Sequence, residues 1–427
     1  MRPSDRGADA EGGTLRCEGW DGGPLVGGGM VGRKARRAIA REYRERPSDC
    51  PLRRRVDASD GAIGRPKSHP NCWIRYVFVA DDLRGAARAA RRSKSSMVPR
   101  HMAPTPSITS PDAAAAARAL YEVMVLLRAV GARLVDLQRD GELPHYAAGL
   151  GEEGAIAGAA LALDAPDWFF GTARDSGAAV ARGMSLDAYF AQVFGRASDP
   201  AMGRQAPGHV SSKAARFASV AGVPGAHLLH AVGLGWASRT QRAENVALAM
   251  FGDGATASEG FHNALNFAGV FRASTVLVCR NSGGAAARGE APTETVAERA
   301  VAYGLASARV DGADALAVVA AVRAAASRAR LGEGATLLEV TTTRWDGDAA
   351  RCPVARLRAA LAAAGAWTDA DEAELSRSTQ SRIDAPLAAA RSAPGPDPRS
   401  MFDFVYATVP PHLERDIPLL DPTFGPK

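Results

Sequence analysis

Residues 246–282, VALAMFGDGATASEGFHNALNFAGVFRASTVLVCRNS, give the clearest indication of the fold. The apolar run Val246–Phe251 predicts a buried strand, and the β-branched run Thr275–Val278 predicts a second one. Between them, Ser258–Phe271 has the periodicity of a helix, with Phe261, Leu265, Phe267 and Val270 as its apolar members. Together they predict a β-α-β unit of a parallel sheet that is covered by helices on both faces.

Polar groups follow both predicted strands. The first strand ends in Gly252-Asp253-Gly254 and the second in Arg280-Asn281-Ser282. Ligands of open α/β sheets bind at this carboxyl edge. The glycines let the backbone approach an anion, and the new helix offers its N–H groups to it. Asp253 is an oxygen ligand suited to Mg²⁺ bound to a diphosphate. A tight turn capped by an aspartate is the plain alternative, and the second strand with its terminal Asn favours the metal site.

The same residues carry a resemblance to a known family. GDG followed by an Asn-containing turn is similar to the thiamine-diphosphate fingerprint. Further matching words are Gly151-Glu152-Glu153-Gly154, Arg174-Asp175, Gly203-Arg204-Gln205, His209, Ala231-Val232-Gly233 and Ala300-Val301-Ala302-Tyr303-Gly304. Over roughly residues 115–415 the chain resembles the alpha subunit of the branched-chain 2-oxo acid dehydrogenase decarboxylating component, with the pyruvate dehydrogenase alpha subunit as a near relative.

The resemblance implies a fold, a site and cofactors. The fold is α/β, a thiamine-diphosphate-binding fold whose parallel sheet has helices on both faces, with a C-terminal helical tail. The implied cofactors are thiamine diphosphate and Mg²⁺. The implied metal site consists of Asp253, Ser282 and the backbone of Gly284. The implied cofactor-binding residues are Arg174, Gly252, Gly254, Ala255 and Arg280.

Several positions depart from the family pattern. Ser282 stands where the family has the second metal ligand, and Ala173 stands where a tyrosine precedes the arginine. His227 replaces a glutamine, and we expect it to be a packing or polar surface residue. Asp348 stands at the place of the family's catalytic histidine, and much of the loop that the histidine begins is missing. An aspartate is a poor neutral-pH acid/base. From the substitutions at Ser282 and Ala173 we expect weakened or lost cofactor binding. Because Asp348 replaces the histidine, the catalytic residue is unknown.

The implied function is that of an alpha subunit. Such a subunit takes part in oxidative decarboxylation of a branched-chain or related 2-oxo acid and passes the acyl group to a lipoyl carrier. The implied partners are a beta subunit, in a heterotetramer of two alpha and two beta chains, and a lipoyl-bearing acyltransferase. The alternative is a catalytically weak or silent paralogue that serves as a structural or regulatory subunit with a beta-type partner.

The N-terminal quarter differs in composition from the rest. Residues 1–101 carry 22 Lys and Arg against 12 Asp and Glu, a net of +10, whereas the remainder carries 30 against 34, a net of −4. Three interpretations stay open: a start site placed too far upstream, with Met97 or Met102 as the true start, a disordered segment, or a basic tail that binds nucleic acid. We expect three parts: this segment at 1–101, a thiamine-diphosphate-binding domain at 102–350, and a helical tail and docking segment at 351–427.

Composition also bears on location. No apolar run is long enough for a membrane span, and the acidic residues near the start argue against a transit peptide. The 5 cysteines form no CxxC or metal spacing, and Cys279 is expected to be a buried apolar residue. We expect a cytoplasmic protein without a membrane partner, and nucleic acid is not the expected partner of the body.

The rest of the body alternates between strand and helix patterns, which favours a parallel sheet. Asp112 is the expected N-cap of a helix that reaches Arg139. Met202–Ser219 is expected to be a long loop, and 354–395 to be helical. The other expected helices are Glu152–Leu163, Pro224–Ser238, Thr293–Tyr303 and Asp314–Ala329, and the other expected strands are Asp167–Phe170, Ala308–Val310 and Ala335–Thr343.

Overall fold

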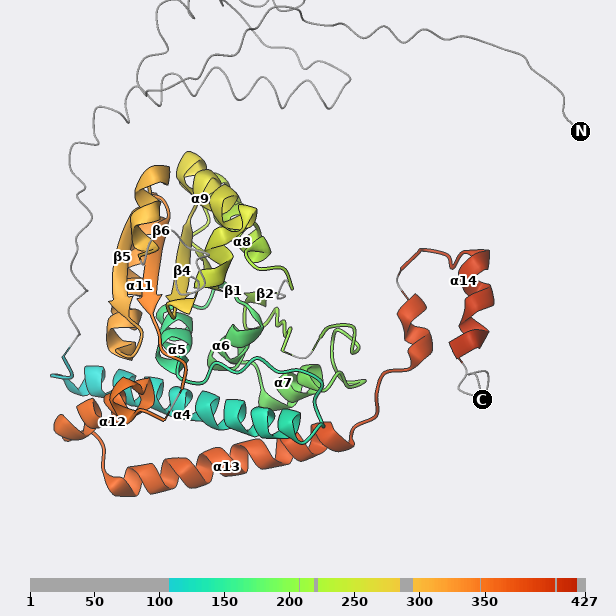
Figure 1. The fold of residues 1–427 in the computed structure, drawn as a ribbon, viewed down its shortest axis with the longest axis horizontal. Coiled ribbons are helices and arrows are strands. Elements are labelled where there is room, and N and C mark those ends of the chain that lie inside the picture. Colours follow the sequence, from blue (N-terminus) through green and yellow to red (C-terminus); the bar gives the residue numbers. More distant parts are fainter. Residues whose placement is uncertain are drawn as a thin grey trace, which may run out of the picture. The chain divides into compact units, whose positions relative to one another are not determined.

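The computed structural model describes residues 107–206, 208–218, 222–284, 295–345, 347–403 and 405–420. The segment 1–101, with its three interpretations, lies outside the described residues. Labels follow Figure 1. The strands are β1 (Trp168–Phe170), β2 (Phe217–Ala218), β3 (Ala247–Gly252), β4 (Thr275–Asn281), β5 (Ala306–Asp311) and β6 (Thr336–Thr341). The α-helices are α4 (Pro111–Arg139), α5 (Glu153–Ala162), α6 (Gly177–Ala181), α7 (Leu186–Val193), α8 (Ala226–Gln241), α9 (Glu259–Phe271), α11 (Ala315–Arg330), α12 (Pro353–Ala363), α13 (Asp369–Ser392) and α14 (Pro411–Asp416). Short 3-10 helices include η2 (Ala173–Asp175), η3 (Asp253–Ala257), η4 (Ala297–Tyr303) and η5 (Ala349–Arg351).

One sheet forms the centre of this part of the chain. Its strands run in the order β2-β1-β3-β4-β6-β5, and every described pair is parallel. The register pairs Gly252 with Arg280 and Asn281 with Thr341. The residues that follow β3, β4 and β6 therefore emerge at the same carboxyl edge, which is where the candidate site lies.

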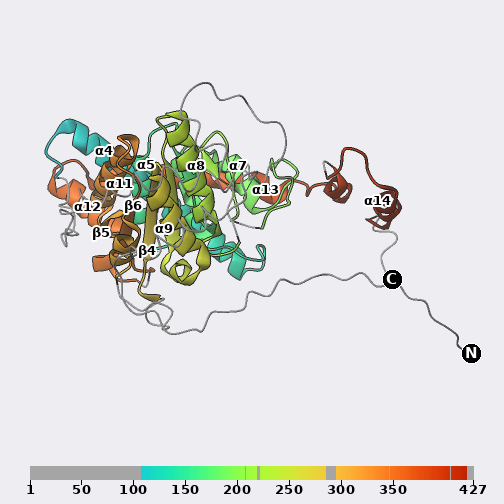
Figure 2. The ribbon, with the colours of Figure 1, turned by 90° about the horizontal axis from the view of Figure 1, so that it is seen from above.

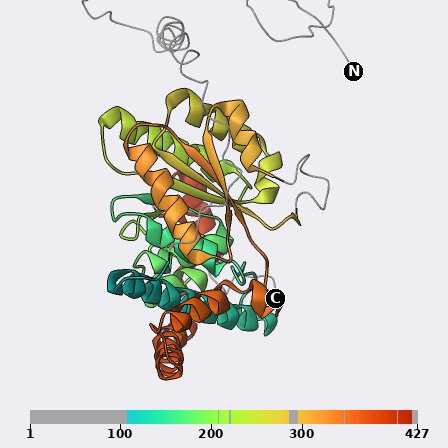
Figure 3. The same cartoon turned by 90° about the vertical axis from the view of Figure 1, so that its left-hand side faces the viewer.

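Both faces of the sheet are covered, as the alternation along β3 shows. Leu248 and Met250 belong to a core shared with α4, α5 and α11, whereas Ala249 and Phe251 belong to a second core shared with α8 and α9. Figures 2 and 3 show these helices against the strands, with α8 beside α9 in Figure 2 and α11 lying across the strands in Figure 3. The predicted fold class, a parallel α/β sheet with helices on both faces, is confirmed.

Most predicted elements are present, and the differences have local causes. β2 lies inside the segment that we expected to be a loop, because its two residues give no periodic signal. Ser110, whose hydroxyl accepts from the Ala113 N–H at 3.2 Å, caps α4, whereas Asp112 lies in the first turn. The expected helix before Tyr303 is a 3-10 helix, η4.

The apolar face of α9 was predicted only in part. Phe261 and Leu265 are buried as expected, together with the alanines between the turns. Phe267 and Val270 are instead exposed, at 40% and 58%. The small residues Ala264 and Ala268 are buried beside Phe261 and Leu265, and α9 packs mainly against α8. The buried face of α9 is therefore rotated away from Phe267 and Val270.

The C-terminal helices α12 and α13 pack against α4 (Figure 1). The carboxylate of Glu372 accepts from the Tyr121 hydroxyl at 2.9 Å and from the Trp367 indole N–H at 2.9 Å. Leu357, Leu361 and residues of α13 share the core that contains α4. The division of the body at residue 351 stays a prediction.

Within the described residues, no helix has both the length and the apolar character that crossing a membrane requires. Cys279 and Cys352 are free and buried, and Cys279 packs in the core between β4 and the α8–α9 layer, as expected for a small apolar residue. Burial raises the pKa of the Cys279 thiol well above its usual range, so this side chain stays uncharged.

Candidate functional site

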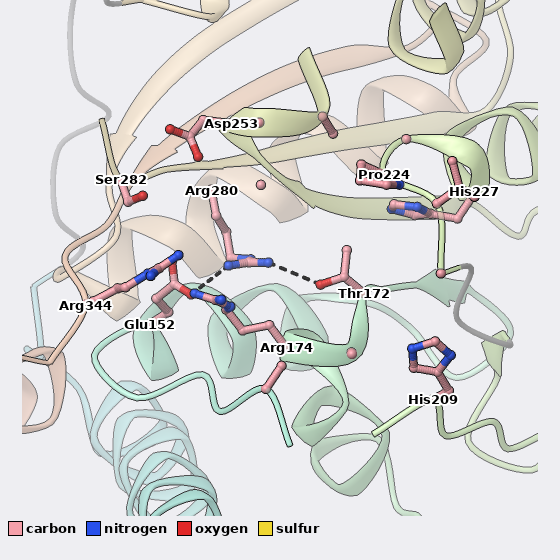
Figure 4. Close-up of a pocket in the computed structure, with 18 of the residues that line it drawn as sticks. Glu152, Thr172, Arg174, His209, Pro224, His227, Asp253, Arg280, Ser282 and Arg344 are labelled. Carbon is pink, nitrogen blue, oxygen red and sulfur yellow. Dashed lines mark hydrogen bonds and ion pairs between the residues drawn. The ribbon is translucent and has the colours of Figure 1, made fainter. Parts of the chain in front are cut away.

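A cavity of about 430 Å³ opens at the carboxyl edge of the sheet (Figure 4). Its size falls within the range of small-molecule sites. Predicted site residues that line it are Arg174, Gly252, Asp253, Gly254, Ala255, Arg280 and Ser282. Two other predicted positions, Gly284 and Asp348, are described but are not part of its lining. The topology thus brings together residues from β3, β4 and η2 that are far apart in sequence.

Asp253 and Ser282 lie at one end of this cavity (Figure 4). Asp253 begins η3 directly after β3, and Ser282 follows the last residue of β4. The amide of Asn281 is turned into the protein, where its Nδ2 donates to the Glu339 carboxylate at 2.8 Å. Ser282, and not the neighbouring asparagine, therefore faces the cavity. Its role as a metal ligand stays a prediction.

Arg280 is the buried centre of a charged cluster. Its Nη1 donates to the Glu152 carboxylate at 2.6 Å, and its Nε lies 2.8 Å from Asp175 Oδ1. Thr172 Oγ1 lies 3.3 Å from Nη2, on the cavity wall (Figure 4). Burial alone would lower the pKa of Arg280, but the carboxylates of Asp175 and Glu152 outweigh it and raise the pKa. The guanidinium is thus permanently charged and already paired within the protein.

Arg174 and Arg344 are the other two arginines that line the cavity, and with Arg280 they form its basic wall. Arg174 Nη1 lies 3.8 Å from Glu152, and its side chain is 28% exposed. Burial lowers the pKa of Arg174. The carboxylate of Glu152 raises it, and the positive charges of Arg280 and Arg344 lower it further. Its charge is therefore only partly compensated in the protein, which favours an anion in the cavity. Arg344 follows β6 and lines the same wall.

His227 lines the opposite side of the cavity, near Pro224 (Figure 4). It is almost fully buried, and its Nε2 lies 2.9 Å from the Met250 carbonyl, so this nitrogen carries the proton. Burial lowers the pKa of His227. Of our two expectations for this residue, packing is right and a surface position is wrong. His145 and His209 also line the cavity.

Asp348 lies apart from these residues. Its side chain is exposed, caps η5 and pairs with Arg351 at 2.9 Å. The hydrogen bond from Arg351, and then that from the Ala350 N–H, lower its pKa. This carboxylate is held ionised outside the cavity lining, so the described position does not suit an acid/base at the reacting atoms.

The lining fits a diphosphate with Mg²⁺. Among the described residues, no group of three or more His, Cys, Asp and Glu side chains forms a metal site of its own. Mg²⁺ does not need such a cage, because it binds through one or two protein oxygens together with phosphate and water oxygens. Asp253 and Ser282 offer those oxygens, Gly254 and Ala255 offer a backbone free of bulk, and the arginines balance the charge. Ser282 is the weak member of the set, because a hydroxyl is a poorer ligand than an amide carbonyl.

Several lining residues were missed as site residues. They are Glu152 at the N-cap of α5, Thr172 in the turn before η2, His145 in a loop, and Arg344 in the segment that follows β6. Glu152 and Arg344 had a signal in the sequence, since Glu152 lies in a matched word and Arg344 directly follows a predicted strand. Neither signal tells which way the side chain points.

Comparisons with known proteins identify the family that this chain resembles. A family model described as "Dehydrogenase E1 component" matches residues 121–399. The chain is similar to the "2-oxoisovalerate dehydrogenase subunit alpha" of Pseudomonas aeruginosa, with 40% identity over 211 residues, 48% of this chain and 52% of the relative. It is also similar to the human mitochondrial protein of that name, with 35% identity over 216 residues, 49% of this chain and 48% of the relative.

The chain thus spans about half the length of the curated relatives that it matches. The family match, by contrast, covers most of the described body, including every strand of the sheet and every residue of the cavity. The chain belongs to the family of dehydrogenase E1 components.

Proposed function

We propose that this chain is the alpha subunit of a thiamine-diphosphate-dependent 2-oxo acid dehydrogenase. The observation that carries the proposal is the convergence of Asp253, Ser282 and three arginines on one cavity at the carboxyl edge of the sheet. This set of charges and oxygens matches a diphosphate with its cation. Family membership supports the same reading.

Members of this family generally depend on thiamine diphosphate and Mg²⁺. In this chain Asp253 and Ser282 would hold the cation, and Arg174 and Arg344 would hold the diphosphate. Arg280 would act behind them, since Glu152 and Asp175 already engage its guanidinium. When bound, thiamine diphosphate supplies the nucleophilic carbon and the electron sink for decarboxylation of a 2-oxo acid. Ser282 is a poorer metal ligand than an asparagine. We therefore propose that this chain binds the cofactor more weakly than it would with an asparagine at position 282.

The proton-transferring group is the open part of the mechanism. Asp348 is exposed and paired with Arg351, so it does not replace the family's histidine at this position. His145 and His209 line the cavity and have a side chain suited to proton transfer at neutral pH. We propose that one of these histidines, or a group from a partner chain, performs the step. The relatives give no support for the alternative of a silent paralogue.

A beta-type partner is the second part of the proposal. The cavity has a basic end with Asp253 and Ser282. Beside Pro224 and His227, however, the described lining residues provide no carboxylate, so a partner chain would have to supply one.

A hydrophobic surface on α8 and α9 also supports a partner. Trp236, Phe267, Val270 and Phe271 form it, with Trp236 stacked on Phe271 at 4.4 Å and Phe267 on Phe271 at 5.8 Å. Trp236 is 46% exposed and Val270 58%. We call this the α8–α9 patch.

Substrate, further partners and location are inferred at a coarser level. The relatives are named for 2-oxoisovalerate, so we propose a branched-chain or related 2-oxo acid. A heterotetramer of two alpha and two beta chains, acyl transfer to a lipoyl-bearing acyltransferase, and a cytoplasmic location complete the proposal.

Reconstitution tests the activity. The full chain is co-purified with a beta-type chain, and CO₂ release from 2-oxoisovalerate is measured with an artificial electron acceptor, with and without thiamine diphosphate and Mg²⁺. We expect cofactor-dependent release, and we expect Asp348→Ala to leave it unchanged. Binding of the cofactor without any turnover on branched-chain, straight-chain or aromatic 2-oxo acids would contradict the catalytic part of the proposal.

A further inference from the structure

A buried carboxylate lies behind the candidate metal end of the cavity. Glu339, in the middle of β6, has no exposed surface. One carboxylate oxygen accepts from Asn281 Nδ2 at 2.8 Å, with Arg309 Nε at 3.6 Å. The other accepts from the backbone N–H groups of Val296 at 2.8 Å and Ala297 at 2.9 Å. All four of these contacts come from donor groups.

The orientation of the Asn281 amide, set by Glu339, in turn affects the backbone around Ser282. Because its Nδ2 faces the Glu339 carboxylate, its Oδ1 faces the other way, where it accepts from the Gly283 N–H at 2.8 Å. This bond closes a turn around Ser282, and Gly283 completes the turn with a φ of +76°. The orientation of one amide thus fixes the backbone that presents the Ser282 hydroxyl to the cavity, near Asp253 (Figure 4).

We propose that Glu339 and Asn281 are positioning residues that hold Ser282 as a metal ligand. The inference rests on the proposed function, since it assigns a role toward the Mg²⁺ of that site. Groups behind a ligand orient it, and their loss typically weakens metal binding about 10–100-fold. Here the orienting effect matters more than usual, because a hydroxyl on a short side chain has little freedom to correct a displaced backbone.

The polarity of the contacts makes a near-isosteric substitution informative. Glu339→Gln places an amide NH₂ against either Asn281 Nδ2 or the two backbone N–H groups, so one donor always meets another. The clash is relieved if the Asn281 amide turns over, which removes the acceptor of the Gly283 N–H. Asn281→Asp alone places two carboxylates against each other at the same contact. Combined, Glu339→Gln and Asn281→Asp restore a donor facing an acceptor, and the introduced aspartate still accepts from Gly283.

The test is the affinity for Mg²⁺ measured by calorimetry on the full chain at saturating thiamine diphosphate. We expect each single variant to lose about tenfold in Mg²⁺ affinity and the double variant to return to within about threefold of the parent. In a Ser282→Ala background, Glu339→Gln should cause no further loss. Glu333→Gln, which removes an exposed carboxylate paired with Arg328, is the matched control and should leave the affinity unchanged.

The outcomes separate this inference from the proposed function. Additive losses in the double variant, or an unchanged Mg²⁺ affinity in folded Glu339→Gln, would overturn the positioning role while the cofactor assignment stands. Absence of Mg²⁺ binding to the parent chain would overturn the proposed function and this inference with it. If a single variant does not fold, the double variant still decides, because weak Mg²⁺ binding by a folded double variant contradicts the proposal.

Discussion

At the metal end of the cavity, a carboxylate and a hydroxyl stand where two neighbouring strands end. Asp253 supplies charge, whereas Ser282 supplies a neutral oxygen on a short side chain. Mg²⁺ tolerates little deviation from octahedral geometry at about 2.1 Å. The difference between these two side chains therefore bears on how tightly the cofactor is held, and each side chain can be changed separately.

Replacing Ser282 measures the weaker ligand. We expect Mg²⁺ affinity, at saturating thiamine diphosphate, to rise in the order Ser282→Ala, the parent chain, Ser282→Asn. The step from serine to asparagine should be about tenfold, or ~1.4 kcal/mol, because an amide carbonyl reaches further. Calorimetry gives the affinities directly. Equal affinity in all three proteins would show that this position does not contact the metal.

His227 gives a prediction for pH. Burial lowers its pKa in the folded protein, so the unfolded chain binds the proton more readily. Stability should therefore be fully present above the ordinary histidine pKa of about 6.5 and should fall as the pH drops below it. Urea unfolding between pH 7.5 and 5.5 should show a shallower decline for His227→Gln, whose amide still donates to the Met250 carbonyl. His412→Gln, at an exposed position of α14, controls for loss of an imidazole. Equal slopes in the parent and His227→Gln would refute the assignment.

At the scale of elements, α8 packs against the sheet through glycine. A Cβ at Gly235 would overlap Thr275 Oγ1 and approach the Ser274 carbonyl oxygen to 2.8 Å, whereas a Cβ at Gly233 meets nothing within 4 Å. We expect Gly235→Ala to destabilise the protein by about 1–3 kcal/mol through overpacking. Gly233→Ala, in the same helix, should stabilise it by about 0.5–1 kcal/mol. Urea unfolding of the pair checks this, and equal effects would mean that α8 does not approach the Ser274–Thr275 backbone as described.

The strands of the sheet differ in how strong a signal they leave in the sequence. β3 and β4 are long apolar runs bounded by turn residues, so the sequence identifies them and the polar groups after them. β2 is two residues long, and its pairing to β1 depends on tertiary contacts alone. The buried face of α9 was missed for a similar reason, because it depends on tertiary packing. Ala264 and Ala268 are buried where α9 packs against α8, and Phe267 and Val270 lie outside that contact.

The candidate site was predictable where strand ends carry it. Asp253 directly follows β3, Arg280 lies near the end of β4 and Ser282 directly follows β4, and all three line one cavity. The direction of Asn281 was not readable from composition, because it depends on a carboxylate of β6 that is 58 residues away. Glu152 and Arg344 likewise depend on how α5 and the end of β6 meet this edge.

At the scale of the whole molecule, the α8–α9 patch gives a prediction about assembly. We expect Val270→Glu to weaken association with a beta-type chain, because it places a charge within an apolar contact. Leu331→Glu is the matched control, since Leu331 is 76% exposed and lies at the end of α11. Size-exclusion chromatography with light scattering on co-purified chains gives the mass of the complex. An intact complex in Val270→Glu would place the partner on another surface.

Asp253 is the proposed anchor of a thiamine diphosphate–Mg²⁺ pair in this cavity. The most direct measurement is calorimetric titration of thiamine diphosphate with Mg²⁺ into the full chain and into two aspartate variants. We predict binding to the parent chain, a loss of about a hundredfold or more in Asp253→Ala, equivalent to ~2.7 kcal/mol, and no change in Asp348→Ala. Affinity that persists in Asp253→Ala, or that is lost equally in both variants, would contradict this role of Asp253.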